Sequence, residues 1–308
     1  MALMHVRSKI FAVLLTMLAW PALAAAGQTV DASDDEPERA RPLFDEGKLL
    51  ATGGVNQVEG AGGGGLSTWA VIGGYGTNDG IGLTVHETFI GLRSFDLNSA
   101  GIAVGLYDRV ELTYSHQSFD TRQTGAALGL GKGFTFDEDV YGAKARLFGK
   151  LVYDQSDWVP QTAVGLQYRV NDRPDILRAI GAKDADGIDF YLAATKLLLS
   201  ESVLISATAR FTRANQFGIL GFGSAAHNDY QPEFEGSAAY LFTKNFAIGT
   251  EYRTKPDNLG FAEQNAYDVF AAYFIDKHAS VTLAYLDLGA IATRRDQNGV
   301  FASLQLGI

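Results

Sequence analysis

Few side chains in this 308-residue sequence have the types and spacing that enzymes use for catalysis. The sequence has five histidines, and none lies in a His-x-x-His motif or a Glu/His cluster of the kind that ligates a metal. It has no cysteine, so it offers neither a thiolate ligand nor a disulfide. We therefore expect no metal site and no cofactor.

One pair of side chains could act as a nucleophile and its base. His116 and Ser118 lie two residues apart on a predicted strand, so they share one face. The pair resembles the His-x-Ser of the outer-membrane phospholipase, a twelve-stranded barrel whose catalytic pair faces outward. A Ser–His pair needs a third group to orient the imidazole, which in that family is an amide on the neighbouring strand. The sequence shows no such partner in 99–107 or 139–150. We expect no enzyme and no catalytic residues, with lipid hydrolysis at His116 and Ser118 as an alternative.

The elements that would position these residues are strands. In the segment 100–119, apolar residues alternate with small or polar ones on both sides of a short turn at Asp108 and Arg109. This period of two is typical of a hairpin with one apolar face. The same pattern recurs to the end of the chain and predicts twelve strands: 81–91, 99–107, 109–119, 139–150, 160–170, 187–198, 202–213, 232–242, 246–255, 266–275, 279–288 and 299–308.

The predicted connections alternate between short turns and long loops, which is typical of an antiparallel transmembrane β-barrel of the bacterial outer membrane. A β-sandwich would mix connection lengths through Greek-key crossings. A fourteen-strand barrel, with 67–75 and part of 47–58 as further strands, is the alternative count. The last strand alternates apolar residues up to Ile308, in the manner of strands that the barrel-assembly machinery recognises, although an aromatic last residue is more usual there.

The two faces of the predicted strands differ in chemistry. One face is apolar, with aromatic residues near the strand ends, as in the interfacial girdles of membrane barrels. The other face is charged with both signs, so arginines can pair with carboxylates across the interior and narrow the path. This mixture predicts a narrow or gated lumen, although the same pairs could serve only to stiffen the barrel. The predicted lumen-lining charges are Glu111, Lys144, Arg146, Arg169, Asp189, Arg210, Glu235, Glu251, Arg253 and Asp268.

A Gly-rich segment precedes the strands. Glycine lets one backbone approach another closely, and no Gly-Lys-Ser/Thr ending follows these glycines, so a phosphate-binding loop is not indicated. Two interpretations stay open: a plug inside the lumen, or a flexible linker with one more strand at 67–75. The candidate plug residues are Glu59, Gly60, Gly62, Gly63, Gly64, Gly65 and Trp69.

Two predicted long loops are unusually apolar, at 126–136 and 217–222. Exposed apolar loops often mark a ligand or partner site. They can equally fold inward, and we expect these loops to seal the mouth of the barrel.

The N-terminus has the pattern of a secretory signal. His5, Arg7 and Lys9 precede an apolar run that ends at Pro21, followed by small-x-small cleavage sites around Ala24. The domain prediction is a cleaved signal peptide at 1–26, a disordered acidic linker at 27–42, a Gly-rich plug-like or accessory segment at 43–78 and the barrel at 79–308. We expect the mature protein in the outer membrane of a Gram-negative bacterium, with membrane lipids and the barrel-assembly machinery as partners. The net charge of −10 argues against nucleic acid.

The stretch from Gly54 to Gly76, with Glu59-Gly-Ala-Gly-Gly-Gly64 at its centre, and the stretch from Val104 to Leu112 resemble a proteobacterial family called domain of unknown function 3034. The resemblance runs from about residue 49 to the end and implies an outer-membrane barrel. It implies no substrate and no catalytic residues. We expect a narrow channel or transporter for small solutes, with a non-conducting structural barrel as the second hypothesis.

Overall fold

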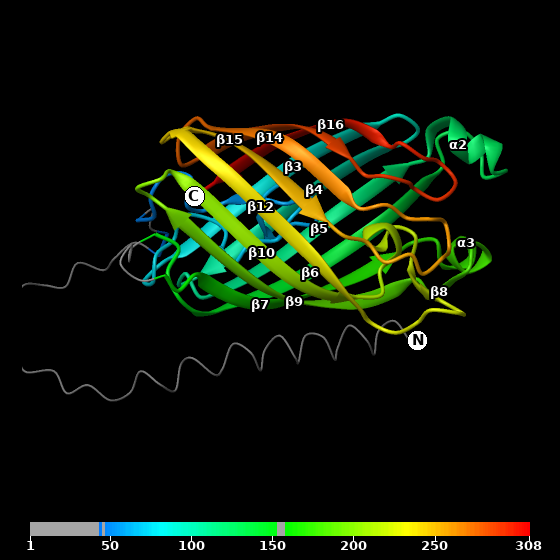
Figure 1. Ribbon diagram of the computed structural model, residues 1–308, viewed down its shortest axis with the longest axis horizontal. Helices are drawn as coiled ribbons and strands as arrows, with labels where there is room; N and C mark the ends of the chain where they lie inside the picture. The colour runs from blue at the N-terminus through cyan, green and yellow to red at the C-terminus, as the bar shows by residue number, and fades with distance from the viewer. Residues whose placement is uncertain (1–42, 45–46, 153–157) are drawn as a thin grey trace, which may run out of the picture. The chain divides into compact units, whose positions relative to one another are not determined.

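The computed structural model describes residues 43–44, 47–152 and 158–308. The predicted signal peptide and the whole of the predicted acidic linker lie outside the described residues. Within the described part, twelve antiparallel strands form a closed barrel (Figure 1). They are β3 (Ile81–Leu92), β4 (Asp96–Leu106), β5 (Val110–Asp120), β6 (Thr135–Phe148), β7 (Gln161–Asn171), β9 (Asp186–Leu198), β10 (Val203–Thr212), β12 (Gln231–Thr243), β13 (Phe246–Arg253), β14 (Ala266–Phe274), β15 (Ala279–Asp287) and β16 (Asn298–Gly307).

The twelve-strand prediction is confirmed, and the fourteen-strand alternative is wrong. The first and last strands close the ring, because β3 pairs with β16 from Leu92 opposite Gly299 to Thr84 opposite Gly307. Residues 67–75 form no barrel strand. The only strands that the described residues form before β3 are β1 (Val55–Asn56) and β2 (Gly62–Gly63), which pair with each other.

The two ends of the barrel carry different connections. At one end, here called the turn end, the strands are joined by 107–109, 149–160, 199–202, 244–245 and 275–278. The other end, here called the loop end, carries 93–95, 121–134, 172–185, 213–230, 254–265 and 288–297. The alternation of lengths has two exceptions. At 93–95, β4 begins three residues before its predicted start and leaves a tight turn among the loops, and the connection 149–160 at the turn end is as long as the loop 254–265.

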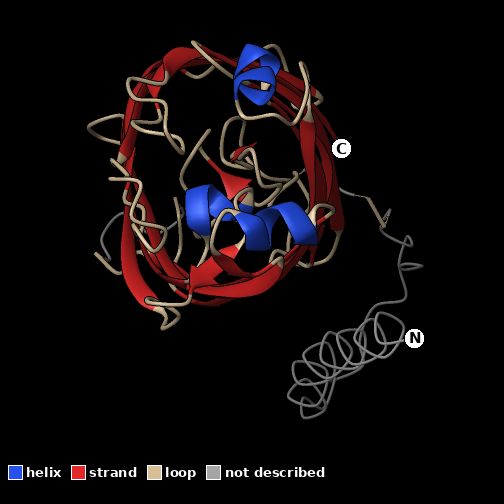
Figure 2. Ribbon diagram, turned by 90° about the vertical axis from the view of Figure 1, so that its right-hand side faces the viewer, coloured by secondary structure: helices blue, strands red, loops and turns tan. Residues whose placement is uncertain are grey.

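Short elements lie in the loops. They are α2 (Arg122–Ala127), α3 (Pro174–Ala179), β8 (Ala182–Asp184), the 3-10 turn η2 (Asn215–Gly218) and β11 (Phe222–Ser224). Because β8 pairs with β11, the loops 172–185 and 213–230 are tied together. Figure 2 looks toward the loop end of the barrel, where the short helices and loops lie in front of the opening of the ring of strands. No helix among the described residues is long and apolar enough to cross a membrane.

Exposure alternates along the strands as the sequence pattern predicts. In β3, for example, inward residues are buried and outward residues such as Val85 and Phe89 are exposed. Tyr114, Tyr141 and Tyr168 form a ladder on the outer face, with ring centroids 5.2 and 6.5 Å apart. An apolar outer face with aromatic bands and a polar inner face is the arrangement of a barrel with lipid outside and polar groups inside.

Candidate functional site in the lumen

Residues 47–76, here called the Gly-rich segment, lie inside the barrel. Their backbone and side chains are hydrogen-bonded to inward side chains of β3, β4, β5, β6, β7, β9, β10, β12, β13 and β16. Ala70, for instance, donates its N–H to Thr195 on β9 and accepts a bond from Gln161 on β7. Contacts that reach strands around most of the ring place the segment across the lumen.

Toward the turn end, the wall binds the backbone of the segment through one ion pair. Glu111 accepts the N–H of Gly62 at 3.0 Å and that of Gly73 at 2.7 Å. Lys144 donates to the carbonyl oxygens of Gly62 at 3.0 Å and Val71 at 2.7 Å. Its Nζ also lies 2.9 Å from the Glu111 carboxylate, and both side chains are only 1% exposed. The Glu111 carboxylate thus accepts hydrogen bonds from backbone amides, and the Lys144 ammonium donates hydrogen bonds to backbone carbonyls, of the same stretch of chain.

Missing side chains let the segment approach the wall here. A Cβ at Gly105 on β4 would overlap the carbonyl oxygen of Gly73 in the segment. A Cβ at Gly74, whose φ is +81°, would lie 2.7 and 2.8 Å from backbone atoms of Gly82 on β3. Glycine is required at both contacts because backbone meets backbone.

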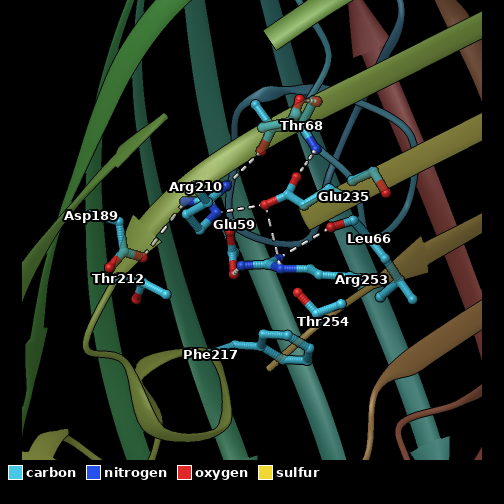
Figure 3. A network of polar contacts seen from close by, with 12 residues as sticks. Glu59, Leu66, Thr68, Asp189, Arg210, Thr212, Phe217, Glu235, Arg253 and Thr254 are labelled. Atoms are coloured by element: carbon cyan, nitrogen blue, oxygen red, sulfur yellow. Dashed lines mark hydrogen bonds and ion pairs between the residues drawn. The ribbon is translucent and has the colours of Figure 1, made fainter. Parts of the chain in front are cut away.

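Toward the loop end, the segment is held by a charged side chain. The two carboxylate oxygens of Glu59 lie 2.9 Å from Nη2 of Arg169 and 2.9 Å from Nη2 of Arg253. Arg210 pairs with Glu235 at 2.5 Å and with Asp189 at 3.5 Å. Figure 3 shows Arg210, Glu235 and Arg253 converging from different strands around Glu59. All are nearly inaccessible to solvent, so the ions depend on one another for stabilisation.

The loops close over this cluster. Arg169 donates to the carbonyl oxygen of Phe217, and Asn171 donates to that of Ile219 at 2.9 Å. The ring of Phe217 lies 4.3 Å from the guanidinium carbon of Arg253 (Figure 3). The predicted apolar loop at 217–222 therefore folds inward, whereas the other one, at 126–136, exposes Leu128.

Lys255 ties three of the loops together just beyond the end of β13. Its Nζ donates to Gln216 at 2.9 Å and to the carbonyl oxygen of Leu288 at 2.7 Å, and it lies 2.9 Å from Glu263. Burial lowers the pKa of Lys255, and the Glu263 carboxylate opposes that shift. Burial likewise raises the pKa of Glu263, and Lys255 opposes it. This buried pair fixes the loops 213–230, 254–265 and 288–297 to one another.

At the turn-end mouth, a smaller set of ions holds both ends of the segment. Lys48 lies 2.8 Å from Asp108 and donates to the carbonyl oxygen of Ile72 at 2.8 Å. Arg146 pairs with the same carboxylate of Asp108. Both ends of the Gly-rich segment therefore meet at the turn end.

The structure places the predicted lumen-lining residues on the inner face and divides them into groups. Arg169, Asp189, Arg210, Glu235 and Arg253 lie together around Glu59, and Glu111 and Lys144 form the pair near the turn end. Arg146 stands apart at the turn-end mouth, with an 11% exposed side chain. Glu251 lies opposite Asp268 in the β13–β14 register and accepts the N–H of Leu66 at 2.7 Å.

The predicted plug residues contact several parts of the wall. Besides Glu59 and Gly62, Trp69 donates its indole N–H to Ser237 at 2.8 Å. Gly60 has a φ of +94° and packs on Ser115, and a side chain at Gly64 would overlap the Glu251 carboxylate. A Cβ at Gly63 would overlap the backbone of Ser67 within the segment, and one at Gly65 would come 3.3 Å from the Phe301 ring.

Sequence reasoning missed two groups of the site. Glu138, 3.7 Å from Arg169, precedes the predicted start of its strand by one residue, although it shares the inward parity of Lys144 and Arg146. Asp108 was assigned only to a turn. A strand start placed one residue earlier would have included Glu138.

The outer face holds a contact that the sequence did not reveal. Asp139 on β6 lies directly opposite His116 on β5, and its Oδ1 is 3.0 Å from the imidazole Nδ1. Tyr114 donates to the same oxygen at 2.9 Å. Ser118 follows on the same face toward the loop end. The expectation that no partner exists on 139–150 is therefore wrong, because an aspartate at the predicted strand start supplies one. Among the described residues, no group of three His, Asp or Glu is arranged to hold a metal.

Residues 52–305 match the model of the family described as "Protein of unknown function (DUF3034)". The chain belongs to this family. Comparison with curated proteins gave no match for this DUF3034 protein.

Several solved outer-membrane barrels resemble the DUF3034 chain in fold. The KdgM porin has a TM-score of 0.47 at 11% identity, over 72% of this chain and 98% of its own. The NanC porin has a TM-score of 0.46 at 10% identity, and the match covers 72% of this chain and 97% of the porin. The outer membrane phospholipase A of Escherichia coli has a TM-score of 0.41 at 9% identity, over 73% and 92%.

Proposed function

We propose that this DUF3034 protein is a gated channel for small solutes in the outer membrane of a Gram-negative bacterium, reached after cleavage of its signal peptide. The Gly-rich segment is the plug. The observation that carries the proposal is that this segment crosses the lumen and is bonded to the wall at both ends of the barrel. Bacterial outer-membrane barrels have short turns on the periplasmic side, so the turn end would face the periplasm and the plug would enter the lumen from that side.

The nature of the contacts favours a removable plug over a permanent core. Apolar side chains of the segment such as Leu66 and Val71 do join the buried core. A permanent core would exclude water mainly with such side chains, whereas here the lumen wall also offers carboxylates, arginines and hydroxyls to the segment. These groups would pair with water and with each other if the segment left. A lumen lined by both charge signs is then a narrow polar path.

Single-channel recording in planar bilayers tests the proposal. We expect the mature protein to be closed and a barrel lacking 47–76 to conduct. The matched control removes 27–42 and keeps the plug, so it should stay closed. Because the shortened barrel lacks many internal contacts, folding is checked by heat-modifiable gel mobility, and Glu59→Gln provides a full-length variant that should open intermittently.

The absence of current in both variants would contradict the proposal. If the folded barrel without 47–76 and the Glu59→Gln variant are both silent, the channel proposal is overturned. The alternative of a non-conducting structural barrel is then favoured.

A second candidate function, lipid hydrolysis on the outer face, is favoured by one contact. The Asp139 carboxylate, 3.0 Å from Nδ1 of His116, can hold the tautomer whose Nε2 accepts a proton. Ser118 would then lose its proton to Nε2 as Oγ attacks an ester carbonyl, and His116 would return the proton to the leaving alcohol.

Hydrolysis is tested with phospholipid in mixed micelles. Turnover by the natural protein that disappears in Ser118→Ala, falls strongly in Asp139→Asn and survives in the outward-facing control Thr250→Ala would establish this function. Equal turnover in all variants, or none in the natural protein, removes it.

A further inference from the structure

The Glu59 carboxylate occupies a site that the barrel wall builds. Arg169 comes from β7 and Arg253 from β13, and each places one Nη2 atom 2.9 Å from a different oxygen of Glu59. We infer that these two arginines form a binding site for small monocarboxylates, that Glu59 fills this site in the closed state, and that solutes of this class open the channel by displacing it. The inference rests on the proposed function.

Only one acidic residue of this cluster can leave the site. Glu59 is the single Asp or Glu in residues 47–76. The other carboxylates around the arginines are Glu138, Asp189 and Glu235, and they belong to β6, β9 and β12. If the plug moves, these three stay with the wall, and the two guanidinium groups lose the carboxylate that bridges them. A carboxylate bridging two guanidinium groups is among the stronger polar contacts in proteins.

One of the two arginines, Arg253, lines a narrow crevice that opens toward the loops. The crevice is also lined by Arg210 and Glu235 and, nearer the loops, by Thr254 and Pro256. Phe217 also lines it and covers Arg253 (Figure 3). A solute that displaces Phe217 would thus meet the guanidinium group of Arg253 first, and would reach Arg169 behind it only by displacing Glu59.

The surrounding charges restrict the class of solute. Glu138, Asp189 and Glu235 would repel any second negative charge on the solute. A single carboxylate replaces that of Glu59 without adding charge. We therefore expect monocarboxylates to be preferred over dicarboxylates, and neutral amides of the same shape to be excluded.

Chemical rescue tests the site without depending on conduction. Glu59→Ala leaves the two arginines facing a small space, and acetate is the probe for it. We expect acetate to raise the melting temperature of the detergent-solubilised Glu59→Ala protein, whereas acetamide does not. Adding Arg253→Met should weaken acetate binding by about 10-fold or more, as loss of a charge-assisted hydrogen bond implies. The control Glu87→Ala, on the outer face of β3, should not respond to acetate.

The outcomes separate the site from the channel. If acetate and acetamide act alike on Glu59→Ala, or if Arg253→Met changes nothing, the inference is overturned even where the plug-deleted barrel conducts. If acetate stabilises Glu59→Ala while every variant is silent in bilayers, the carboxylate site stands and the channel fails.

A full-length measurement covers the case in which Glu59→Ala does not fold. In the natural protein, acetate on the loop side should increase the open fraction of single channels relative to chloride at equal ionic strength. If the protein conducts and its open fraction is the same with both anions, the inference is overturned.

Discussion

The two halves of the lumen hold the Gly-rich segment by different chemistry. Near the turn end, the wall recognises the backbone: Glu111 accepts two amides, Lys144 donates to two carbonyls and Gly105 leaves room for the chain. Near the loop end, the wall also binds backbone, because Arg253 donates to the carbonyl oxygen of Leu66 and Glu235 accepts the N–H of Thr68. Only there, however, does it also bind a carboxylate side chain of the segment, Glu59.

This difference indicates how the segment could be released. Backbone contacts that need glycine on both sides are specific to this chain and tolerate little substitution. An ion pair to one carboxylate can be replaced by another carboxylate. We therefore expect the contacts of the turn-end half, here called the anchor, to stay in place. The contact of Glu59 in the loop-end half, here called the latch, is the one that another carboxylate could replace.

The largest expected effect breaks the anchor. Lys144→Met leaves Glu111 buried without its cation and two carbonyls of the segment without their donor. Removing one partner of a buried ion pair costs about 3–5 kcal/mol. We expect the free energy of unfolding to fall by that amount. It is measured by urea titration of protein that has been folded into lipid vesicles. The exposed Lys183→Ala is the control. A loss below 1 kcal/mol would mean that the pair is not an anchor.

A smaller effect is expected from steric pressure at the same place. Gly105→Val puts a side chain against Gly73 and should cost about 1–3 kcal/mol, the usual range for overpacking. Because the barrel can keep its ladder while the segment shifts, the same variant should show faster protease cleavage within 47–76. The outward Ala100→Val on the same strand is the control, and equal cleavage rates in both would refute the close fit.

An effect similar in size to that of Gly105→Val sharpens the comparison at the latch. Glu59→Gln keeps the shape of the side chain and removes its charge, so it should cost about 1.5–3 kcal/mol, as for a hydrogen bond to a charged group. It should leave the turn-end contacts in place for most of the time, so protease cleavage at Gly73 should rise less than in Gly105→Val. Cleavage at Gly73 as fast as in Gly105→Val would show that the two halves are not independent.

The barrel itself could be predicted from the sequence because its signal is local. Alternation along each strand and the lengths of the connections give the strand count, and the inward positions of Arg169 and Arg210 follow from parity alone. The start of β4 at Asp96 and the position of Glu138 were missed because polar residues continue the strands beyond their apolar part.

The site could be predicted only in part, because it depends on contacts between distant segments. The sequence lists Glu59 and Arg253 but cannot say that they meet, since their pairing requires the segment to enter the ring. The His116–Asp139 contact likewise depends on the β5–β6 register, which no pattern within either strand determines. The glycines allowed both a linker and an inner segment, and hydrogen bonds to the wall distinguish the two.

The seam between β3 and β16 has a consequence for biogenesis. The segment precedes β3 in the chain, yet it is bonded to strands that follow much later, up to Gln305 on β16. If the barrel closed first, the thirty residues of the segment would have to enter through its open end. They would then have to form all their hydrogen bonds with the wall inside a confined space. Wrapping the sheet around a chain that is already in position avoids this threading. The early part of the polypeptide would then act as a template on which the cylinder is completed.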